Sequence, residues 1–246
     1  MALNLKNSFP EKDQEEIDIL IKRFYHHLCD ISLESLKAFS MSPEEIVKRH
    51  HIINPELADH YFGKGTSVIA EPGHYNNFEW GSLSPGLQMK YPILCFYKPL
   101  TNKFTDAYVK QHRMKFGTRM ESIKFTSRAF EGLKSTPTAY IMAADQSPTN
   151  LKDCYWIDFL GQDTAWLHGP EKYARLYNLP VVFVDIQKVK RGYYLLELVP
   201  LTEAPVSLPD GEITRLYAEQ IEKSILNEPA YWLWSHKRWK QSRTEL

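Results

Sequence analysis

The 246-residue chain has few cysteines, no surplus of charge and no long apolar run. Its three cysteines, Cys29, Cys95 and Cys154, are widely spaced and form no C-x-x-C pair, which argues against a disulfide framework or a zinc ribbon. A reducing compartment is the simplest setting for such thiols. The 30 Lys and Arg residues balance the 30 Asp and Glu residues, so the chain lacks the global positive field of nucleic-acid-binding proteins. Any basic patch must be local.

The sequence also shows no sign of a membrane span or of a second domain. No stretch approaches the roughly 20 consecutive apolar residues that cross a bilayer, and the start lacks the basic-then-apolar pattern of a signal peptide. This predicts a soluble or peripheral protein. No linker-like, repetitive or low-complexity segment divides the sequence, so we expect one large domain over residues 1–246.

Strand-like and helix-like apolar patterns alternate along the chain. Asp13 and Glu16 form a capping pair before a helical pattern, and Ser42-Pro43 marks a second helix start. Further helices are expected from about Thr105, Gly169 and Asp210, and strands at 66–71, 91–97, 139–143, 155–160, 181–186 and 193–199. The short link 188–192 suits an antiparallel hairpin between the last two strands. The fold class predicted is α/β, with a mostly parallel or mixed central sheet and helices on both faces.

A histidine and a glutamate, His74 and Glu79, follow the strand predicted at 66–71. In one regular helix they would lie about 140° apart, so a contact between them requires the chain to turn. Gly73 and Asn76-Asn77 tolerate the backbone conformations of such a corner. A carboxylate on one imidazole nitrogen fixes the tautomer and raises the basicity of the other. The pair is therefore a candidate general base, His74, oriented by Glu79.

Chance and metal binding are the alternatives to this interpretation. An H-x4-E string is common, but this one lies at the carboxyl end of a predicted strand, where ligands bind in α/β sheets. His50, His51 and His60 could suggest a metal, yet adjacent positions do not converge on one ion, and no H-E-x-x-H motif is present. We expect these three histidines on helix surfaces, with no metal and no cofactor.

Four further residues are candidates for binding a substrate. Arg113 has the bidentate donors that suit a phosphate, or it is an ordinary helix-surface arginine. Asp145 and Gln146 follow an apolar strand at a ligand-facing position, or they form a turn that ends the strand. Gly161 lets backbone amides approach a carbonyl or phosphate closely, or it is a plain turn residue.

The C-terminal segment combines indoles with cations. Its members are Trp232, Trp234, His236, Lys237, Arg238, Trp239, Lys240 and Arg243. This composition is favoured at membrane interfaces with anionic headgroups. Tryptophans that pack in the core beside solvated cations would give the same sequence pattern, so both interpretations stay open.

The order of short motifs resembles that of the bacterial late acyltransferases of lipid A biosynthesis, within the lysophospholipid-acyltransferase-like superfamily. The resemblance covers nearly the whole chain. It rests on the segments Asn7-Ser8-Phe9-Pro10, Gly73-His74-Tyr75-Asn76-Asn77-Phe78-Glu79-Trp80, Arg113 with Phe116-Gly117, Ala144-Asp145-Gln146-Ser147-Pro148, Phe159-Leu160-Gly161, Leu179-Pro180-Val181-Val182, Glu228-Pro229 and 232–239. The superfamily motif most often has Asp at the second position, and the lipid A branch uses Glu, as at Glu79.

The resemblance implies an enzyme that moves a fatty acyl chain from acyl carrier protein to a hydroxyl of a lipid A precursor. It implies His74 and Glu79 as catalytic residues and the cytoplasmic face of the bacterial inner membrane as the location. Relatives usually begin with a hydrophobic anchor, whereas this chain opens with Met1-Ala2-Leu3-Asn4-Leu5, so a trimmed or unusually short member is expected.

Three other functions compete with this one. The same chemistry could act on an amino-acid-containing lipid or a lysophospholipid. A non-enzymatic lipid-binding protein with this fold has no reason to keep both His74 and Glu79. A metal-dependent hydrolase would be sensitive to chelators.

Overall fold

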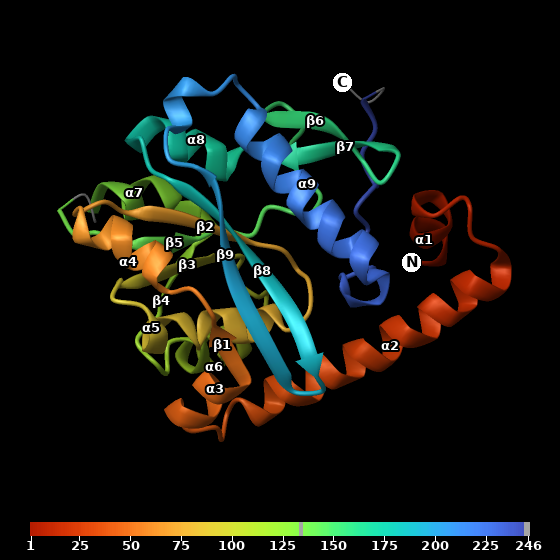
Figure 1. Ribbon diagram of the computed structural model, residues 1–246, viewed down its shortest axis with the longest axis horizontal. Coiled ribbons are helices and arrows are strands. Elements are labelled where there is room, and N and C mark those ends of the chain that lie inside the picture. Colours follow the sequence, from red (N-terminus) through yellow and green to blue (C-terminus); the bar gives the residue numbers. More distant parts are fainter. Residues whose placement is uncertain (133–134, 244–246) are drawn as a thin grey trace.

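A seven-stranded sheet forms the centre of the computed structural model, which describes residues 1–132 and 135–243 (Figure 1). In sheet order the strands are β1 (His50–Ile52), β9 (Tyr193–Thr202), β8 (Val181–Lys190), β2 (Val68–Pro72), β5 (Ala139–Ile141), β3 (Ile93–Tyr97) and β4 (Arg119–Ser122). The β8–β9 pair is antiparallel and the other neighbouring pairs are parallel. The predicted α/β class and the predicted hairpin are therefore confirmed.

A separate two-stranded sheet contains β6 (Cys154–Phe159) and β7 (Gln162–Leu167). The strand expected at 155–160 exists, but it does not belong to the central sheet. Leu160 and Gly161 both have positive φ, at 52° and 67°, so the chain reverses at once into an antiparallel partner. A parallel central strand would have needed a crossover of a dozen or more residues instead.

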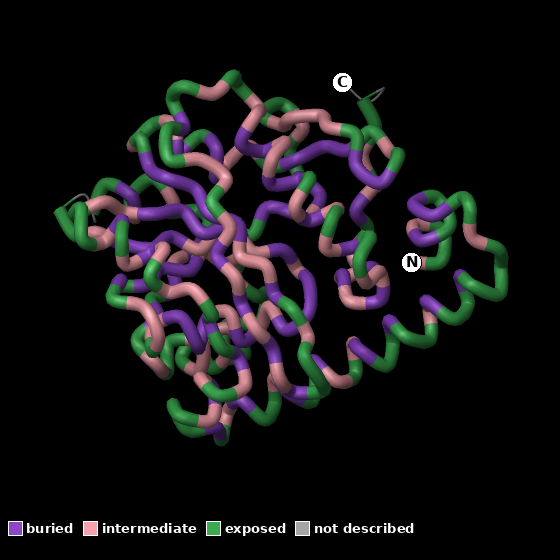
Figure 2. The backbone as a smooth tube through the Cα atoms, viewed as in Figure 1, coloured by how far each residue is buried: buried purple, intermediate pink, exposed green. Residues whose placement is uncertain are grey.

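The helices follow the start signals in the sequence. They are α1 (Ala2–Ser8), α2 (Gln14–Lys37), α3 (Pro43–Arg49), α4 (Glu56–Gly63), α5 (Pro85–Gln88), α6 (Lys103–Arg113), α7 (Thr126–Gly132), α8 (Gly169–Tyr177) and α9 (Glu212–Asn227), with short 3-10 turns η1 (Phe78–Ser82), η2 (Ile123–Phe125), η3 (Pro205–Ser207) and η4 (Pro229–Tyr231). The predicted capping box of Asp13 and Glu16 is formed at α2, and Ser42 accepts from the Glu45 amide at α3. Buried and exposed residues alternate along α2 at helical spacing (Figure 2).

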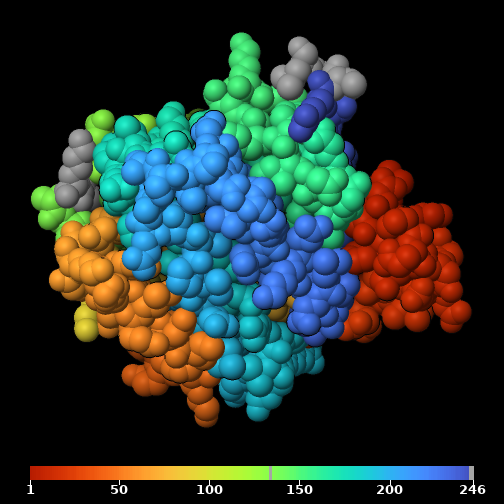
Figure 3. All heavy atoms as spheres, turned by 45° about the horizontal axis from the view of Figure 1, so that its top comes forward, coloured from red at the N-terminus to blue at the C-terminus, as the bar shows by residue number. Residues whose placement is uncertain are grey.

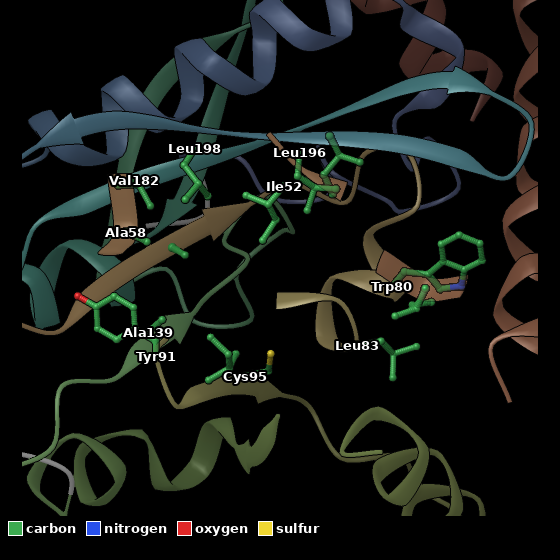
Figure 4. Packing of buried hydrophobic residues seen from close by; sticks show 14 of the residues in the cluster. Ile52, Ala58, Trp80, Leu83, Tyr91, Cys95, Ala139, Val182, Leu196 and Leu198 are labelled. Atoms are coloured by element: carbon green, nitrogen blue, oxygen red, sulfur yellow. The ribbon is translucent and has the colours of Figure 1, made fainter. Parts of the chain in front are cut away.

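Both faces of the central sheet are covered. Side chains of β2 alternate, so Val68 and Ala70 lie in one core and Ile69 in the other. The first core packs the sheet against α3, α4, η1 and the residues that follow α2. Ala58 of α4 and Trp80 of η1 are among its members (Figure 4). The second core packs it against α7, α8 and α9. Since β2 lies between β8 and β5, its carboxyl end is held from both sides.

A third core lies beside the sheet and joins the two ends of the chain. It brings α1 and α2 together with β6, β7, α9 and the segment that follows η4. The first residues project as a lobe on one side of the molecule (Figure 3). Trp232 and Trp234 are buried in this core, and Trp239 is half-buried. Of the two interpretations of the C-terminal tryptophans, core packing is the one observed.

The histidine prediction needs a correction. His50 is not on a helix surface: it begins β1, is fully buried, and its Nδ1 lies 2.7 Å from Ser84 Oγ. Burial lowers the pKa of His50 to about 3. His51 is exposed on the same strand, and His60 is exposed on α4. The residue spacing did not reveal that the short strand β1 joins the sheet edge and covers His50.

Candidate active site

Gly73 allows the corner after β2 to lie against α9. A Cβ atom at this position would lie 2.2 Å from Ile221 Cδ1, a distance at which something must shift. The requirement at Gly73 is therefore space, because its φ is not positive. Close packing of α9 against Gly73 fixes the start of the loop that carries His74.

Asn76 and Asn77 complete the corner, as the sequence predicted. Asn76 has a φ of 53°, in the left-handed region that asparagine tolerates, and its side chain donates to the Ile186 carbonyl at 2.6 Å. The Asn77 side chain accepts from the Trp80 amide at the start of η1 and donates to Glu34 of α2. The loop is thus fastened to both β8 and α2.

Asp145, and not Glu79, is the carboxylate bound to His74. Its Oδ1 lies 2.5 Å from His74 Nδ1, and its Oδ2 accepts from the His74 amide at 2.8 Å. The two residues follow β2 and β5, which are adjacent and parallel, so their loops meet at one edge of the sheet. The side chain of Asp145 is 1% exposed and that of His74 is 20% exposed. An ionised Asp145 only accepts, so Nδ1 carries the proton and Nε2 is left as the basic nitrogen.

The charges of this pair support each other. Burial is the largest single influence and lowers the pKa of His74, but the charge and hydrogen bond of Asp145, together with the charge of Glu79, hold that pKa above its usual value. Burial likewise raises the pKa of Asp145, but the charge and hydrogen bonds of His74, with the hydrogen bond from Trp232, together bring that pKa to about 2. Asp145 is therefore ionised at neutral pH and favours the imidazolium that forms when His74 takes a proton.

The turn η4 and the segment after it hold this pair and its loop in place, which the sequence did not predict. Trp232 Nε1 donates to Asp145 Oδ2 at 2.9 Å, and both side chains are buried. The Leu233 amide donates to the His74 carbonyl at 3.1 Å, and the Asn76 amide donates to the Tyr231 carbonyl at 3.0 Å. The indole-rich motif was visible in the sequence, but a contact across 87 residues has no local signal.

Arg238 places a buried cation behind the pair. Its guanidinium lies over the Trp166 ring at 4.6 Å, and its three nitrogens have no hydrogen-bond partner among the described residues. Burial lowers the pKa of Arg238 to about 10, while the charge of Asp145 opposes that shift. Arg238 thus remains charged at neutral pH and adds to the positive potential that favours an ionised Asp145.

Glu79 lies at the other side of the site and binds Arg113. Glu79 Oε2 accepts from Arg113 Nη2 at 2.6 Å, and both side chains are partly exposed. The prediction that Glu79 orients His74 through a direct contact is therefore not what the structure has. The 3-10 turn η1 directs Glu79 toward the end of α6, where Arg113 lies. Glu79 still raises the pKa of His74 through its charge, after the larger effects of burial and Asp145.

Two cavities meet at the Glu79–Arg113 pair. One, of about 430 Å³, contains His74 and is bordered by polar groups that include Lys98, Gln146 and Ser147. The other, of about 440 Å³, is lined mainly by apolar side chains of α2, η1 and α6. Phe78, Glu79 and Arg113 line both. A ligand with one polar and one long apolar part fits this arrangement.

Of the two remaining predicted site residues, Gln146 lies at the site and Gly161 does not. Gln146 lines the cavity that contains His74. Gly161 lies in the β6–β7 turn, at the opposite end of the hairpin from Leu167, which borders the cavity. The structure does not bring Gly161 to the site, and its positive φ accounts for the glycine. Among the described residues, no group of three or more His, Cys, Asp and Glu side chains could hold a metal ion.

The site therefore combines an imidazole with a free basic nitrogen, a fixed guanidinium and a long apolar cavity. The model of the bacterial lipid A biosynthesis acyltransferases matches residues 1–241. The chain belongs to this family. The predicted family resemblance is confirmed, and the chain is an acyltransferase of the lipid A biosynthesis type.

Curated relatives of this family match at low identity over most of their length. The lipid A biosynthesis lauroyltransferase of Escherichia coli is 23% identical over 240 residues, which cover 96% of this chain and 77% of the relative. The lipid A biosynthesis palmitoleoyltransferase of Escherichia coli and the lipid A biosynthesis acyltransferase of Shigella flexneri are each 21% identical over 238 residues, 96% of this chain and 76% of theirs. None of the helices in residues 1–132 and 135–243 has the length and apolarity to cross a membrane.

Proposed function

We propose that this acyltransferase moves a fatty acyl chain from the thioester of acyl carrier protein to a hydroxyl of a lipid A precursor. The family match and the relatives' names support the lipid A acceptor and the acyl group. The observation that carries the proposal is the 2.5 Å contact of His74 Nδ1 with Asp145, which leaves Nε2 basic in a cavity that adjoins an apolar one.

His74 is the general base of the proposed reaction. Its Nε2 takes the proton of the acceptor hydroxyl as the oxygen attacks the thioester carbonyl, and an oxyanion forms on that carbonyl. The attack forms the new C–O bond. The oxyanion then collapses to the ester as the C–S bond breaks, and the leaving thiolate takes the proton back from His74. Asp145 holds the tautomer throughout and stabilises the imidazolium. The acyl thioester is a co-substrate, so this reaction needs no metal and no cofactor.

Arg113 and Glu79 position the anionic part of a substrate. The Glu79 carboxylate holds the guanidinium of Arg113 where the two cavities meet, and this contact uses one edge of it. Its other N–H groups are suited to a phosphate of the acceptor. Gln146 offers a further polar contact within the cavity of His74. Glu79 in this proposal fixes Arg113, which replaces the predicted role of orienting the base.

The apolar cavity takes the acyl chain of the donor. Leu28, Ile31, Phe39 and Val109 line it, and it reaches the polar cavity at Phe78. A chain bound there would place its thioester beside His74. Such a site works at the cytoplasmic face of the inner membrane, where carrier-bound acyl groups and lipid acceptors meet.

Acyl transfer by the purified protein tests this proposal. The assay offers acyl carrier proteins with different acyl chains to a phosphorylated lipid A precursor, and separately to a lysophospholipid. We expect transfer to the lipid A precursor, and a loss of about 100-fold to 10,000-fold in His74→Ala, the range that a general base contributes.

His60→Ala is the matched control, since His60 is exposed on α4. Undiminished transfer by His74→Ala would reject His74 as the base. Transfer to the lysophospholipid alone would move the function to the other acceptor.

A further inference from the structure

One segment of this neutral protein has a clear excess of cations over acidic residues. Residues 98–128 contain eight Lys and Arg residues but only two Asp and Glu residues, whereas the whole chain has 30 of each kind. Both acidic groups are engaged: Asp106 accepts from Tyr97 and from the Leu100 amide, and Glu121 accepts from the Ser122 amide. Two of the eight cations are also paired, Arg113 with Glu79 and Arg128 with Glu121. The remaining cations still give the segment a local positive potential that the overall composition hides.

The same segment exposes large apolar side chains. None of the eleven described residues of α6 is buried, and Phe104 and Tyr108, one turn apart, are 89% and 57% exposed. Leu100, Ile123 and Phe125 are exposed beside it. An amphipathic helix whose apolar side chains remain in water is unusual in a folded protein. We call these five apolar residues, with Lys98, Lys103 and Lys124, the basic-apolar surface.

The contacts of β3, β4 and α6 place this surface at one edge of the molecule. Tyr97 and Ser122 are paired at the ends of the parallel strands β3 and β4, so the residues that follow them leave the sheet side by side. The bonds of Asp106 to Tyr97 and Leu100 fasten α6 over the end of β3. Tyr108 stacks on Phe39 at 5.4 Å, which joins the surface to the end of α2.

Both cavities of the active site open beside this surface. Lys98 and Ile123 border the cavity of His74, and Leu100 and Val109 border the apolar cavity. A substrate that enters from this side reaches the base without crossing the body of the protein. The partner bound here therefore also sets where the substrate comes from.

We propose that the basic-apolar surface docks on a lipid bilayer with anionic headgroups, so that both cavities open toward the membrane. The lysines match the negative surface potential, and Phe104 and Tyr108 enter the headgroup region. This inference rests on the proposed function for its lipid acceptor, but its contacts with the bilayer are independent of catalysis.

A soluble acidic partner is the competing occupant, since acyl carrier protein would also meet these lysines. A protein interface places its aromatic anchors in shaped pockets and packs them closely. Phe104 protrudes almost fully from a helix with no buried residue, and a bilayer accepts such a ring without a complementary shape. The exposed side chains therefore favour the bilayer.

Vesicle binding by the purified chain tests the proposal. Co-sedimentation is measured with vesicles that contain phosphatidylglycerol and with vesicles of phosphatidylcholine alone, at low and high salt. We expect stronger, salt-sensitive binding to the anionic vesicles. The charge variant Lys103→Gln with Lys124→Gln should weaken this binding by about 30-fold. The apolar variant Phe104→Ser with Tyr108→Ser should weaken it by about 10-fold or more.

Matched controls separate this surface from general effects. Lys172→Gln with Lys223→Gln removes the same charge from exposed positions on α8 and α9, and Leu176→Ser removes an exposed apolar side chain from α8. These should bind as the unchanged protein does, with equal melting temperatures throughout.

Two results would overturn the proposal. One is binding that ignores anionic lipid and all four surface substitutions. The other is a charge variant that binds vesicles normally but loses transfer from acyl carrier protein, which would assign the surface to the carrier. His74→Ala should bind vesicles normally, so a failure of the proposed reaction leaves the docking result readable.

Discussion

At the level of single residues, the site and the sequence motif differ in the carboxylate that serves the base. The motif suggested Glu79, whereas the structure has Asp145 beside His74. The sequence singled out His74 and Asp145 as residues that follow strands, and the structure has the two in contact at one edge of the sheet. What the spacing could not give was the direction of each side chain. Glu79 turns toward Arg113 because η1 is a 3-10 turn, and this depends on how Asn77 and Glu34 hold it.

Asp145→Asn should separate the charge of this partner from its shape. The amide keeps the size of the carboxyl group, but its NH2 group facing Nδ1 favours the tautomer in which Nε2 carries the proton. We expect the rate of acyl transfer to fall by roughly 1,000-fold to 10,000-fold. Without the carboxylate the pKa of His74 also falls, so the acid limb of kcat/KM should move to lower pH.

The control for this variant is Asp158→Asn, an exposed position on β6. It should leave both the rate and the acid limb unchanged. If Asp145→Asn kept the original pH profile, Asp145 would not set the charge of His74.

Among the elements, those with local signals were predictable and those made by long-range pairing were not. The caps at Asp13 and Ser42 correctly gave the starts of α2 and α3, and the 188–192 link correctly gave the β8–β9 hairpin. The short strands β1 and β4 and the segment after η4 carry too few residues for a periodic pattern. Their places are set by partners that are distant in the sequence, as the bond of Trp232 to Asp145 illustrates.

The packing of helix α9 against Gly73 can be tested by substitution at the contact. Gly73→Ala puts a methyl group 2.2 Å from Ile221 Cδ1, so the fully buried Ile221 side chain must turn aside, or α9 and the His74 loop must move apart. Overpacking of this kind costs about 1–3 kcal/mol of stability, and a displacement near 1 Å at the base costs about 100-fold in rate.

Ile221→Val removes the clashing Cδ1 atom and supplies the rescue. The double variant should recover most of the lost activity and melting temperature, while Ile221→Val alone should stay near the parent in rate. Full activity in Gly73→Ala, measured in the same transfer assay, would mean that the corner adapts and that the close approach is not required.

For the molecule as a whole, buried titratable groups set the pH range of stability. Burial lowers the pKa values of His27 and His50 to about 3, whereas both titrate near 6.5 when unfolded. The unfolded chain therefore binds more protons below pH 6.5, and their stabilising contribution is lost as the pH falls from 6.5 toward 3. Burial and the neighbouring Glu171 raise the pKa of Glu71, so its contribution is present below about pH 4.5 and is lost at higher pH. His74, with a raised pKa, favours the folded state below pH 6.5 and offsets part of the acid loss.

The free energy of unfolding should therefore begin to fall near pH 6.5, well above the pKa of an ordinary carboxyl group. Each buried neutral histidine adds up to about 1.4 kcal/mol per pH unit to the slope of the unfolding free energy against pH. His50→Asn keeps a polar atom near Ser84 Oγ but cannot titrate, so it should remove about half of the slope due to His27 and His50 between pH 6 and pH 4. Urea unfolding at several pH values measures this, with His51→Asn as the exposed neighbour that should change nothing. If the pH slope of the unfolding free energy were unaltered in His50→Asn, His50 would take up its proton without unfolding. Its complete burial against Trp80 and Tyr194 argues against that outcome.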